Sequence, residues 1–385
     1  MKTHKGQDIL KCYYDRFPGK AQLYFAPGRI NLLGEHIDYN AGYVMPAAIT
    51  QGFWFAIGEA EENEFSVYSA TMDEYVHGDF SSISKSKGWK NYILGVIHQF
   101  IEKGHSLKGF HAVFGGDLPL GAGLSSSAAL ECGLAVALND FNSLQLSKKN
   151  IAFLCQKAEH TYPEVKCGIM DQYASMFGEK NKILFLDCIH IESEKIEFPT
   201  THSIVLINSN VKHNLNDGGY NKRRMQAEEG LSIIQKKFPQ VLNFRDASDD
   251  QLNRVKNEMH HEIFQRCKYI IEEIDRAKKG AHYLKSGDIT AFGKCMYASH
   301  EGLKNLYEVS CPELDFLVNE SSKFMEVKGA RLMGGGFGGC TINLIESQHA
   351  AIVAERISNS YLEHFKMNAS VYMVSPGDGA HHIKG

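Results

Sequence analysis

A glycine- and serine-rich segment over residues 118–130 has the composition of a phosphate-binding loop. It reads Leu118-Pro-Leu-Gly-Ala-Gly-Leu-Ser-Ser-Ser-Ala-Ala-Leu130 and runs into a stretch that is almost wholly apolar or small. Gly121 and Gly123 allow a tight turn that approaches a ligand closely, and the three serines at 125–127 are good N-cap residues. The start of a buried helix offers unpaired N–H groups and a positive dipole end, which suit a phosphate. A loop that merely caps its helix is the alternative, and the Lys of a Walker-type loop is absent.

Charged side chains gather in a second segment, residues 26–46. Arg29, Glu35, His36 and Asp38 stand there among apolar and turn-forming residues. Charges in such a setting need partners or a ligand to offset the loss of hydration. Glu, His and Asp carry the donors and acceptors that suit sugar hydroxyls. An internal network of Arg and carboxylates is the alternative interpretation.

A third cluster, residues 329–340, is dense in glycine. Gly334, Gly336 and Gly339 fit the G-x-G-x-x-G spacing, but the apolar strand expected at 341–345 follows where a dinucleotide fold needs a helix. We therefore reject a dinucleotide site. The loop either passes close to a ligand or forms a tight hairpin.

Composition places the chain among ordinary globular proteins of about two domains. It has 385 residues, 43% hydrophobic and 22% charged, with a net charge of −4. The mild acidity gives no reason to expect a nucleic-acid partner. No apolar run approaches the ~20 residues of a membrane span, and the first eight residues lack a signal-peptide core. Nine cysteines without a C-x-x-C pair favour reduced thiols, and so a cytoplasmic protein.

Hydrophobic periodicity predicts the elements that must position these motifs. In the first half, strands are expected near 22–26, 53–57, 65–67, 110–114 and 183–186, and helices near 91–103, 126–142, 147–161 and 170–177. In the second half, strands are expected at 203–207, 330–333, 341–345 and 370–374, and helices at 262–276 and 350–365. Mixed strands and segregated helices in both halves indicate α+β domains, which meet near residues 198–202.

The motifs together resemble those of the galactokinases, within the GHMP kinase superfamily. The resemblance rests on Gly28-Arg-Ile-Asn-Leu-Leu-Gly-Glu-His-Ile-Asp-Tyr-Asn40, Cys167-Gly-Ile-Met-Asp-Gln172 and Asn214-Leu-Asn-Asp-Gly-Gly-Tyr-Asn-Lys-Arg-Arg224, with a looser match at 375–380. It runs from about residue 20 to the end. It implies an N-terminal domain of the ribosomal protein S5 domain 2 type (1–198) and a ferredoxin-like C-terminal domain (199–385). The active site would lie in the cleft between them, and the last strand could pack on the first domain.

The resemblance also implies catalytic roles. Asp171 corresponds to the aspartate beside the anomeric hydroxyl of the sugar, where it acts as general base or as charge stabiliser. Arg29 corresponds to its partner, which favours the charged carboxylate and can stabilise the transferring phosphoryl group. In a loose transition state, alignment and charge neutralisation dominate, so both roles of Asp171 stay open.

Substrate positions follow in the same way. Glu35 and His36 would bind the C6 side of the sugar, Asp38 the O3 and O4 hydroxyls, and Tyr220 the axial O4, with the backbone at Gly168 contributing. Ser127 and Glu159 would lie on the Mg²⁺ side. The ATP-binding residues implied are Gly121, Ala122, Gly123, Leu124, Ser125, Ser126, Ser127, Ala128 and Trp89. From the residues alone, Trp89 could be a core tryptophan, Tyr220 an ordinary aromatic at a helix start, and Glu159 a surface acid.

We therefore expect an ATP-dependent kinase that converts α-D-galactose to galactose 1-phosphate, the first step of galactose catabolism (the Leloir pathway). A kinase for N-acetylgalactosamine or another hexose is the alternative enzyme. A non-catalytic sensor of galactose and ATP is disfavoured because the run Ser125–Ala129, Arg29 and Asp171 are all present. The expected partners are the two small substrates, with Mg²⁺ accompanying ATP, no nucleic acid, no membrane and a monomeric state.

Overall fold

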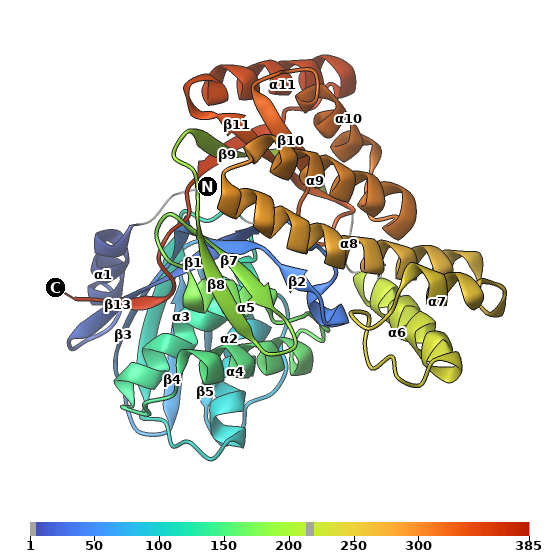
Figure 1. Cartoon of the computed structure of the whole chain (residues 1–385). Coiled ribbons are helices and arrows are strands. Elements are labelled where there is room, and N and C mark those ends of the chain that lie inside the picture. Colours follow the sequence, from blue (N-terminus) through green and yellow to red (C-terminus); the bar gives the residue numbers. More distant parts are fainter. Residues whose placement is uncertain (1–4, 120, 213–218, 385) are drawn as a thin grey trace.

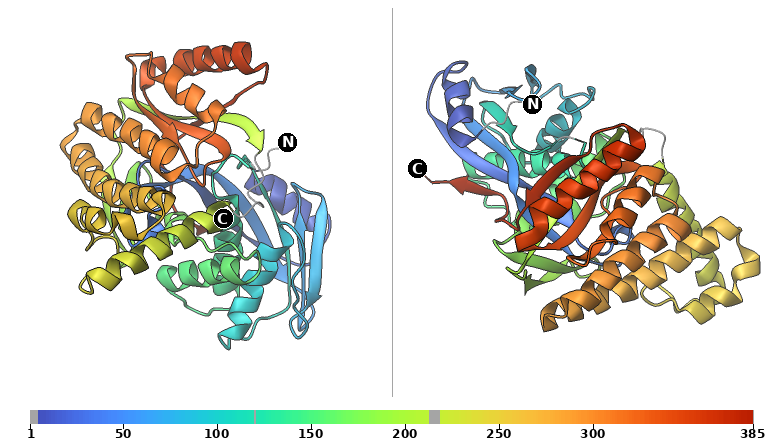
Figure 2. Two further views of the ribbon diagram at one scale, coloured as in Figure 1. Left: turned by 90° about the vertical axis from the view of Figure 1, so that its right-hand side faces the viewer. Right: turned by 90° about the horizontal axis from the view of Figure 1, so that it is seen from above.

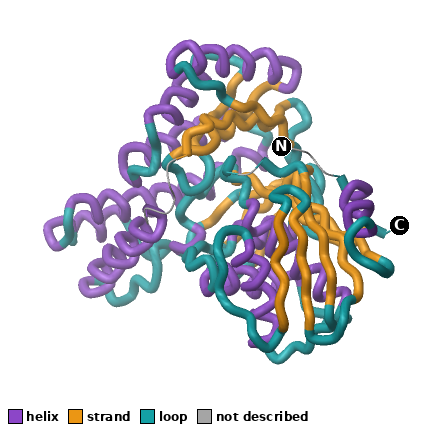
Figure 3. Tube along the Cα trace, turned by 180° about the vertical axis from the view of Figure 1, so that it is seen from behind, coloured by secondary structure: helices purple, strands orange, loops and turns teal. Residues whose placement is uncertain are grey.

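The computed structural model describes residues 5–119, 121–212 and 219–384 (Figure 1). Its first half is built on a six-stranded sheet in the order β13-β1-β3-β6-β4-β5, antiparallel except for the β4–β6 pair. The strands are β1 (Ala21–Asn31), β3 (Pro46–Glu59), β4 (Glu64–Ser69), β5 (Glu74–Asp79), β6 (Phe110–Gly116) and β13 (His381–Ile383). In Figure 3 the strands of this sheet lie side by side in front of the helices.

Alternation along β1 decides what covers each face of the sheet. Tyr24 belongs to the large core under the helices, whereas its neighbour Leu23 packs with Ile9 and Tyr13 of the first helix on the opposite face. A Cβ at Gly133 would lie 2.1 Å from the ring of Phe55, so α3 sits directly against β3. The helices of this half are α1 (Gly6–Tyr14), α2 (Lys90–Glu102), α3 (Ser126–Phe141), α4 (Lys148–Thr161) and α5 (Met170–Phe177).

A small antiparallel sheet, β2-β7-β8, completes the first half. Its strands are β2 (Tyr43–Val44), β7 (Lys182–Asp187) and β8 (Glu192–Glu197). Arg245 from the second half donates to both carboxylate oxygens of Asp187, at 2.6 and 2.8 Å. This half-buried ion pair fastens the small sheet to the helical part of the second half.

The second half carries an antiparallel sheet of its own, in the order β10-β11-β9-β12. Its strands are β9 (His202–Lys212), β10 (Val327–Leu332), β11 (Gly338–Glu346) and β12 (Ser370–Val374). Its helices are α6 (Gly219–Lys237), α7 (Asp249–Arg254), α8 (His261–Ser286), α9 (Ile289–Gly302), α10 (Pro312–Ser321) and α11 (Ala350–Phe365). Helices α9, α10 and α11 pack against this sheet, while α6, α7 and the start of α8 project away from it (Figure 2).

Short helical turns join these elements. Among the described residues, 3-10 turns occur at Asp38–Asn40, Lys256–Glu258 and Ser347–His349, and Leu303–Tyr307 is a π-helical turn at the end of α9. Both halves mix helices and sheets, so the predicted α+β class is confirmed. Within the described residues, no helix has the length and apolar character needed to cross a membrane.

Several strands differ from the prediction. Strands β3 and β9 are longer than expected, and β2, β5 and β8 were not predicted. Two further differences concern β1 and β13. β1 does not stop at residue 26 but continues to Asn31, so Arg29 lies on a strand instead of in a turn; the backbone pairs with β3 beyond an irregularity between Pro27 and Arg29. The sequence pattern also gave no sign of β13, which pairs with β1 through His381–Ile383 (Figure 1). Both depend on pairing partners that are remote in the chain.

Candidate active site

A cavity of about 710 Å³ collects most of the predicted site residues. Its lining comes from both halves of the chain, because Tyr220, Gly334 and Gly335 face residues of the first half across it. The predicted residues that line it are Arg29, Glu35, His36, Asp38, Trp89, Gly121, Gly123, Leu124, Ser125, Ser126, Ser127, Glu159, Asp171 and Tyr220. Ala122 and Ala128 are fully buried beside it. Residues 214–218 of the predicted Asn214–Arg224 motif lie outside the described residues.

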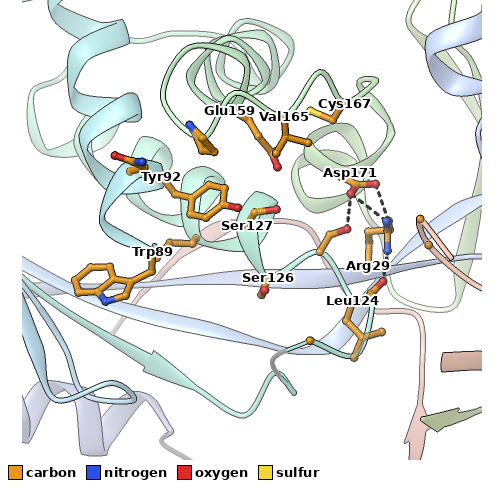
Figure 4. A pocket seen from close by; sticks show the side chains of 18 of the residues that line it. Arg29, Trp89, Tyr92, Leu124, Ser126, Ser127, Glu159, Val165, Cys167 and Asp171 are labelled. Carbon is orange, nitrogen blue, oxygen red and sulfur yellow. Dashed lines mark hydrogen bonds and ion pairs between the residues drawn. The ribbon is translucent and has the colours of Figure 1, made fainter. Parts of the chain in front are cut away.

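Arg29 on β1 binds Asp171 on α5 through a two-pronged ion pair. The guanidinium donates from Nε to Oδ1 at 2.7 Å and from Nη2 to Oδ2 at 3.0 Å (Figure 4). Its third nitrogen, Nη1, donates to the carbonyl of Gly123 at 2.7 Å. Such bidentate pairs fix geometry as well as charge. The catalytic pair predicted from the sequence is therefore brought together and tied to the glycine loop.

Ser125 begins α3 in an unusual backbone conformation. It has φ 52° and ψ 54°, in the left-handed region, and its side chain makes no capping hydrogen bond. Its hydroxyl donates to Oδ2 of Asp171 instead. The expectation that Ser125 caps the helix is thus wrong, since its hydroxyl is aimed at the carboxylate of Asp171. The first N–H groups of α3 have no side-chain cap and are available to an anion.

Glu35 is buried within residues 28–40, which we call the signature segment, with 2% of its surface exposed. Its Oε1 accepts from the backbone N–H of Gly334 at 2.8 Å and from Nη2 of Arg331 at 3.2 Å. Arg331 also donates from Nε to the carbonyl of Leu32 at 2.8 Å. The second carboxylate oxygen of Glu35 belongs to a side chain that lines the cavity, where it can accept from a substrate hydroxyl.

His36 has both ring nitrogens in contact with protein atoms. Nδ1 lies 2.7 Å from the hydroxyl of Tyr39, and Nε2 lies 3.2 Å from the carbonyl of Gly335. Burial lowers the pKa of His36 to about 4, so the ring is neutral near pH 7. Its backbone φ of 61° is in the left-handed region, which costs energy for a residue with a side chain.

Asp38 follows in a single 3-10 turn and faces the same cavity. Burial raises the pKa of its carboxyl to about 7, and the negative charge of Asp171 raises it further in the same direction. Gly168 lies against this carboxyl, because a Cβ there would be 1.9 Å from Oδ2 of Asp38. The structure thus places Gly168 beside Asp38, as a residue whose lack of a side chain leaves room for that carboxyl.

Tyr220 stands in the first turn of α6 and reaches the cavity from the second half. Its ring centroid lies 5.3 Å from that of His36 and 5.4 Å from that of Tyr39. Burial raises the pKa of its hydroxyl well above the usual value, so it stays a neutral donor. It is a wall of the site and not an ordinary surface aromatic.

Glu159 is buried on the cavity side of α4 with 6% of its surface exposed, which rules out a surface acid. Nε2 of Gln172 donates to its Oε2 at 2.7 Å, and Ser127 lines the same cavity. Burial raises the pKa of Glu159 to about 7, with the charge of Asp171 adding to the effect. The structure thus places Ser127 and Glu159, the two oxygen donors predicted for the Mg²⁺ side, in the lining of one cavity.

Trp89 lies at the other end of the site. In the view of Figure 4 it stands opposite the Arg29–Asp171 pair, with Ser127 between them. One face is packed edge-on against Phe114, with ring centroids 5.2 Å apart, yet the indole lines the cavity. Its buried Nε1 has no hydrogen-bond partner. Trp89 is thus a partly packed ring that also lines the cavity, with its indole nitrogen buried.

Sequence reasoning missed three contributors to this site: Arg331, Tyr39 and Gln172. A signal existed for Arg331, which is an arginine within an apolar strand beside the glycine cluster. Such a residue needs buried acceptors, and it finds Glu35 and three backbone carbonyls. The glycine cluster itself forms the β10–β11 hairpin and also contacts the cavity, so its two interpretations hold together.

Comparison with known proteins gives long matches. The galactokinase of Thermotoga petrophila is 37% identical over 359 residues, which cover 93% of this chain and 99% of that protein. The galactokinase of Fusobacterium nucleatum is 34% identical over 376 residues, covering 96% and 97%. The crystal structure of Lactococcus lactis galactokinase complexed with galactose superposes with a TM-score of 0.93 at 32% identity, covering 97% of this chain and 98% of that one. A mevalonate kinase structure shares the fold alone, with a TM-score of 0.60 at 20% identity over 92% of this chain and 98% of that one.

Family models match three stretches of the chain. Residues 91–179 match the GHMP kinases N terminal domain and residues 281–363 the GHMP kinases C terminal model. The fold is thus that of a GHMP kinase, which confirms the predicted class. Residues 11–59 match the galactokinase galactose-binding signature. The chain therefore belongs to the galactokinase family and is a sugar kinase.

Proposed function

We propose that this kinase transfers the γ-phosphoryl group of ATP to the anomeric oxygen of galactose and releases galactose 1-phosphate and ADP. The observation that carries the proposal is the position of Asp171. Its carboxylate is held by Arg29 and Ser125 between the start of α3 and the walls formed by Glu35, Asp38 and Tyr220. A nucleotide phosphate and a sugar hydroxyl can therefore meet at one carboxylate.

In the proposed reaction, a bond forms between O1 of the sugar and the γ-phosphorus while the bond to the β–γ bridging oxygen breaks. The proton of O1 passes to Asp171, or passes to an oxygen of the transferred phosphoryl group while the charge of Asp171 stabilises the approach. The electron pair of the broken bond stays on the β-phosphate oxygen of ADP. Arg29 offsets negative charge on Asp171 and on the phosphoryl group. The uncapped N–H groups at the start of α3 hold the phosphates, and the positive φ of Gly121 and Gly123 lets the loop turn around them.

Ser127 and Glu159 suit Mg²⁺ bound together with ATP. No group of three or more His, Cys, Asp or Glu side chains among the described residues has the geometry of a metal site. One carboxylate and one hydroxyl match the way Mg²⁺ is usually held, with phosphate and water oxygens completing the shell. When bound there, the ion would neutralise charge on the β- and γ-phosphates. Ser127 and Glu159 would orient it, and Gln172 fixes the rotamer of Glu159.

The sugar specificity would come from buried polar groups that need partners. Asp38 and Tyr220 face the cavity together, and a sugar whose hydroxyls fail to reach them leaves both unpaired. Sites of this kind discriminate strongly between stereoisomers. The cytoplasmic location and the monomeric state expected from the sequence stay predictions.

The test is Asp171→Asn, which keeps an acceptor for Arg29 but removes the charge. We expect kcat to fall by about 10²–10⁴-fold while the melting temperature changes little. Asp275→Asn, on the exposed face of α8, is the matched control and should keep full turnover. Undiminished turnover in Asp171→Asn would remove this carboxylate from the mechanism. Assays of wild-type protein with galactose and N-acetylgalactosamine decide the main substrate, since faster turnover of the acetylated sugar rejects galactose.

A further inference from the structure

Two tyrosines behind the sugar-facing wall form a chain of hydroxyl groups that ends on His36. The hydroxyls of Tyr307 and Tyr39 lie 3.0 Å apart, and that of Tyr39 lies 2.7 Å from Nδ1 of His36. On the other side of the ring, Nε2 lies 3.2 Å from the carbonyl oxygen of Gly335. Tyr307 is fully buried and His36 is 3% exposed, while Tyr39 between them is half-buried.

The donor and acceptor capacities of these groups fix the direction of hydrogen-bond donation along the series. A carbonyl oxygen can only accept, so Nε2 of His36 carries a proton and donates it to Gly335. Nδ1 of a neutral ring is then an acceptor, and the hydroxyl of Tyr39 must donate to it. Because the proton of the Tyr39 hydroxyl is directed at the ring of His36, the Tyr39 oxygen accepts a hydrogen bond from the hydroxyl of Tyr307. Every proton in the series is thereby assigned.

The surroundings favour the neutral ring on which this assignment depends. Burial is the main cause that lowers the pKa of His36, and the cations of Arg223 and Arg331 act in the same direction. Glu35 and the carbonyl of Gly335 oppose them without reversing the shift. The burial of both tyrosine rings raises the pKa of each hydroxyl, so both stay protonated donors.

The fold places Tyr307 at this point through a local irregularity. It is the last residue of the π-helical turn Leu303–Tyr307, and π turns are rare and often occur at functional sites. Nε of Arg223 donates to the carbonyl of Tyr307 at 2.6 Å, and Arg266 donates to that of Leu306. Two buried cations therefore hold the turn in a position from which the Tyr307 hydroxyl meets Tyr39.

We propose that Tyr39 and Tyr307 are positioning residues, which fix His36 as the neutral ring protonated at Nε2 and so fasten the Gly334–Gly335 hairpin tip to the signature segment. The proposal rests on the proposed function for the identity of the sugar. Two consecutive residues of the signature segment bind two consecutive residues of the hairpin tip. Glu35 accepts from the N–H of Gly334, and His36 donates to the carbonyl of Gly335. With both nitrogens of His36 engaged by the protein, its contribution to sugar binding is to hold this wall in place.

Tyr39→Phe and Tyr307→Phe each remove one hydroxyl from the hydrogen-bonded series that ends on His36. Tyr43→Phe is the control. Tyr43 stacks on Phe185 outside the cavity lining, with ring centroids 5.1 Å apart. Tyr39→Phe removes the donor to His36, whereas Tyr307→Phe leaves that donor in place. We expect the KM for galactose to rise on the order of tenfold in Tyr39→Phe and about two- to threefold in Tyr307→Phe, with kcat changed by less than about threefold. Tyr43→Phe should match the wild type.

A spectroscopic measurement separates positioning from a general loss of structure. In protein labelled with ¹⁵N-histidine, and with His36 assigned by comparison with His36→Gln, Nε2 should carry the proton and Nδ1 should show an accepted hydrogen bond. In Tyr39→Phe the Nδ1 resonance should move towards that of an unbonded ring nitrogen. A proton on Nδ1 in the wild type, or an unmoved resonance in Tyr39→Phe, overturns the proposal. The spectrum is recorded on free protein, so a different sugar substrate would change the assays and leave this result standing.

Discussion

Glu35 and Arg331 form an ion pair in which both side chains are buried. The two residues are 296 positions apart, and Oε1 of Glu35 lies 3.2 Å from Nη2 of Arg331. The side chain of Arg331 has no exposed surface and that of Glu35 has 3%. One residue belongs to the signature segment and the other to β10. The pair therefore sets the relative position of two walls of the sugar site.

Arg331→Met should destabilise the protein strongly. The apolar side chain has a similar length, but it leaves the carboxylate of Glu35 buried without its cation, at a cost of about 3–5 kcal/mol in the free energy of unfolding. Arg254→Met is the control, because its ion pair with Asp250 is more than half exposed on both sides and should contribute about 0–0.5 kcal/mol. Urea unfolding measures both. A loss below about 1 kcal/mol in Arg331→Met would contradict the importance of the pair.

Ser125 offers a comparison of two substitutions that lose the same hydroxyl. Ser125→Gly and Ser125→Ala both remove the hydrogen bond to Asp171, and kcat should fall about 10- to 100-fold in each. Their stabilities should differ, because φ is 52° here and alanine in this region costs about 1 kcal/mol more than glycine. Assays and thermal melts check the two effects. Wild-type turnover in either variant, or a glycine variant less stable than the alanine variant, speaks against this role.

Asp38→Asn should stabilise the sugar-free protein in alkaline solution while weakening its activity. The folded-state pKa of Asp38, about 7, is above the ordinary value of 3.8, so the folded state keeps a proton that the unfolded state releases. Stability from this group is present at low pH and is lost as pH rises towards 7. The neutral amide escapes this loss and should gain about 1–3 kcal/mol at pH 8 relative to wild type, but almost none at pH 4.

Unfolding of both proteins across pH 4–8 measures this difference. A difference that is constant with pH, or that shrinks as pH rises, would contradict a buried carboxyl with a raised pKa. Galactose kinetics recorded in parallel should show the opposite ranking, with the stabilised variant the poorer enzyme.

Trp89 should report on nucleotide binding. The chain has two tryptophans, and the other, Trp54, packs on Phe25 and lies against α1. In Trp54→Phe protein, a non-hydrolysable ATP analogue should change the remaining indole fluorescence, whereas Trp89→Phe protein should show no change. Trp89→Ala should raise the KM for ATP about 3- to 10-fold and leave the KM for galactose unaltered. Equal responses of the two single-tryptophan proteins would place the nucleotide elsewhere.

Elements governed by local pattern were predictable from the sequence. Helices α5 and α11 and strand β12 have the bounds that the apolar periodicity indicates. Helix α8 continues ten residues beyond its predicted end, because its last turns bury small residues such as Gly280 and Ala281 that give a weak periodic signal. The residues at the catalytic carboxylate were named from motifs, and the structure brings them to one cavity.

Features governed by distant contacts were not predictable. The left-handed backbone of Ser125 is compatible with its hydroxyl bond to Asp171, a partner on another helix. The hydroxyl chain from Tyr307 to His36 depends on a π turn that no spacing in the sequence indicates. The ion pair of Arg331 with Glu35 forms only because the fold brings β10 beside the signature segment, so the sequence does not predict it. Motifs identify chemistry, but the contacts that orient it follow from packing.

The pairing of β13 with β1 has a consequence for the newborn polypeptide. During synthesis β1 is made early, and β13, the strand that covers its free side, is made long after it. Throughout translation that side exposes unsatisfied amides and carbonyls, which invite association with other nascent chains. The side of β1 at Leu23–Phe25 therefore stays an unpaired strand edge until residues 381–383 are available to cover it.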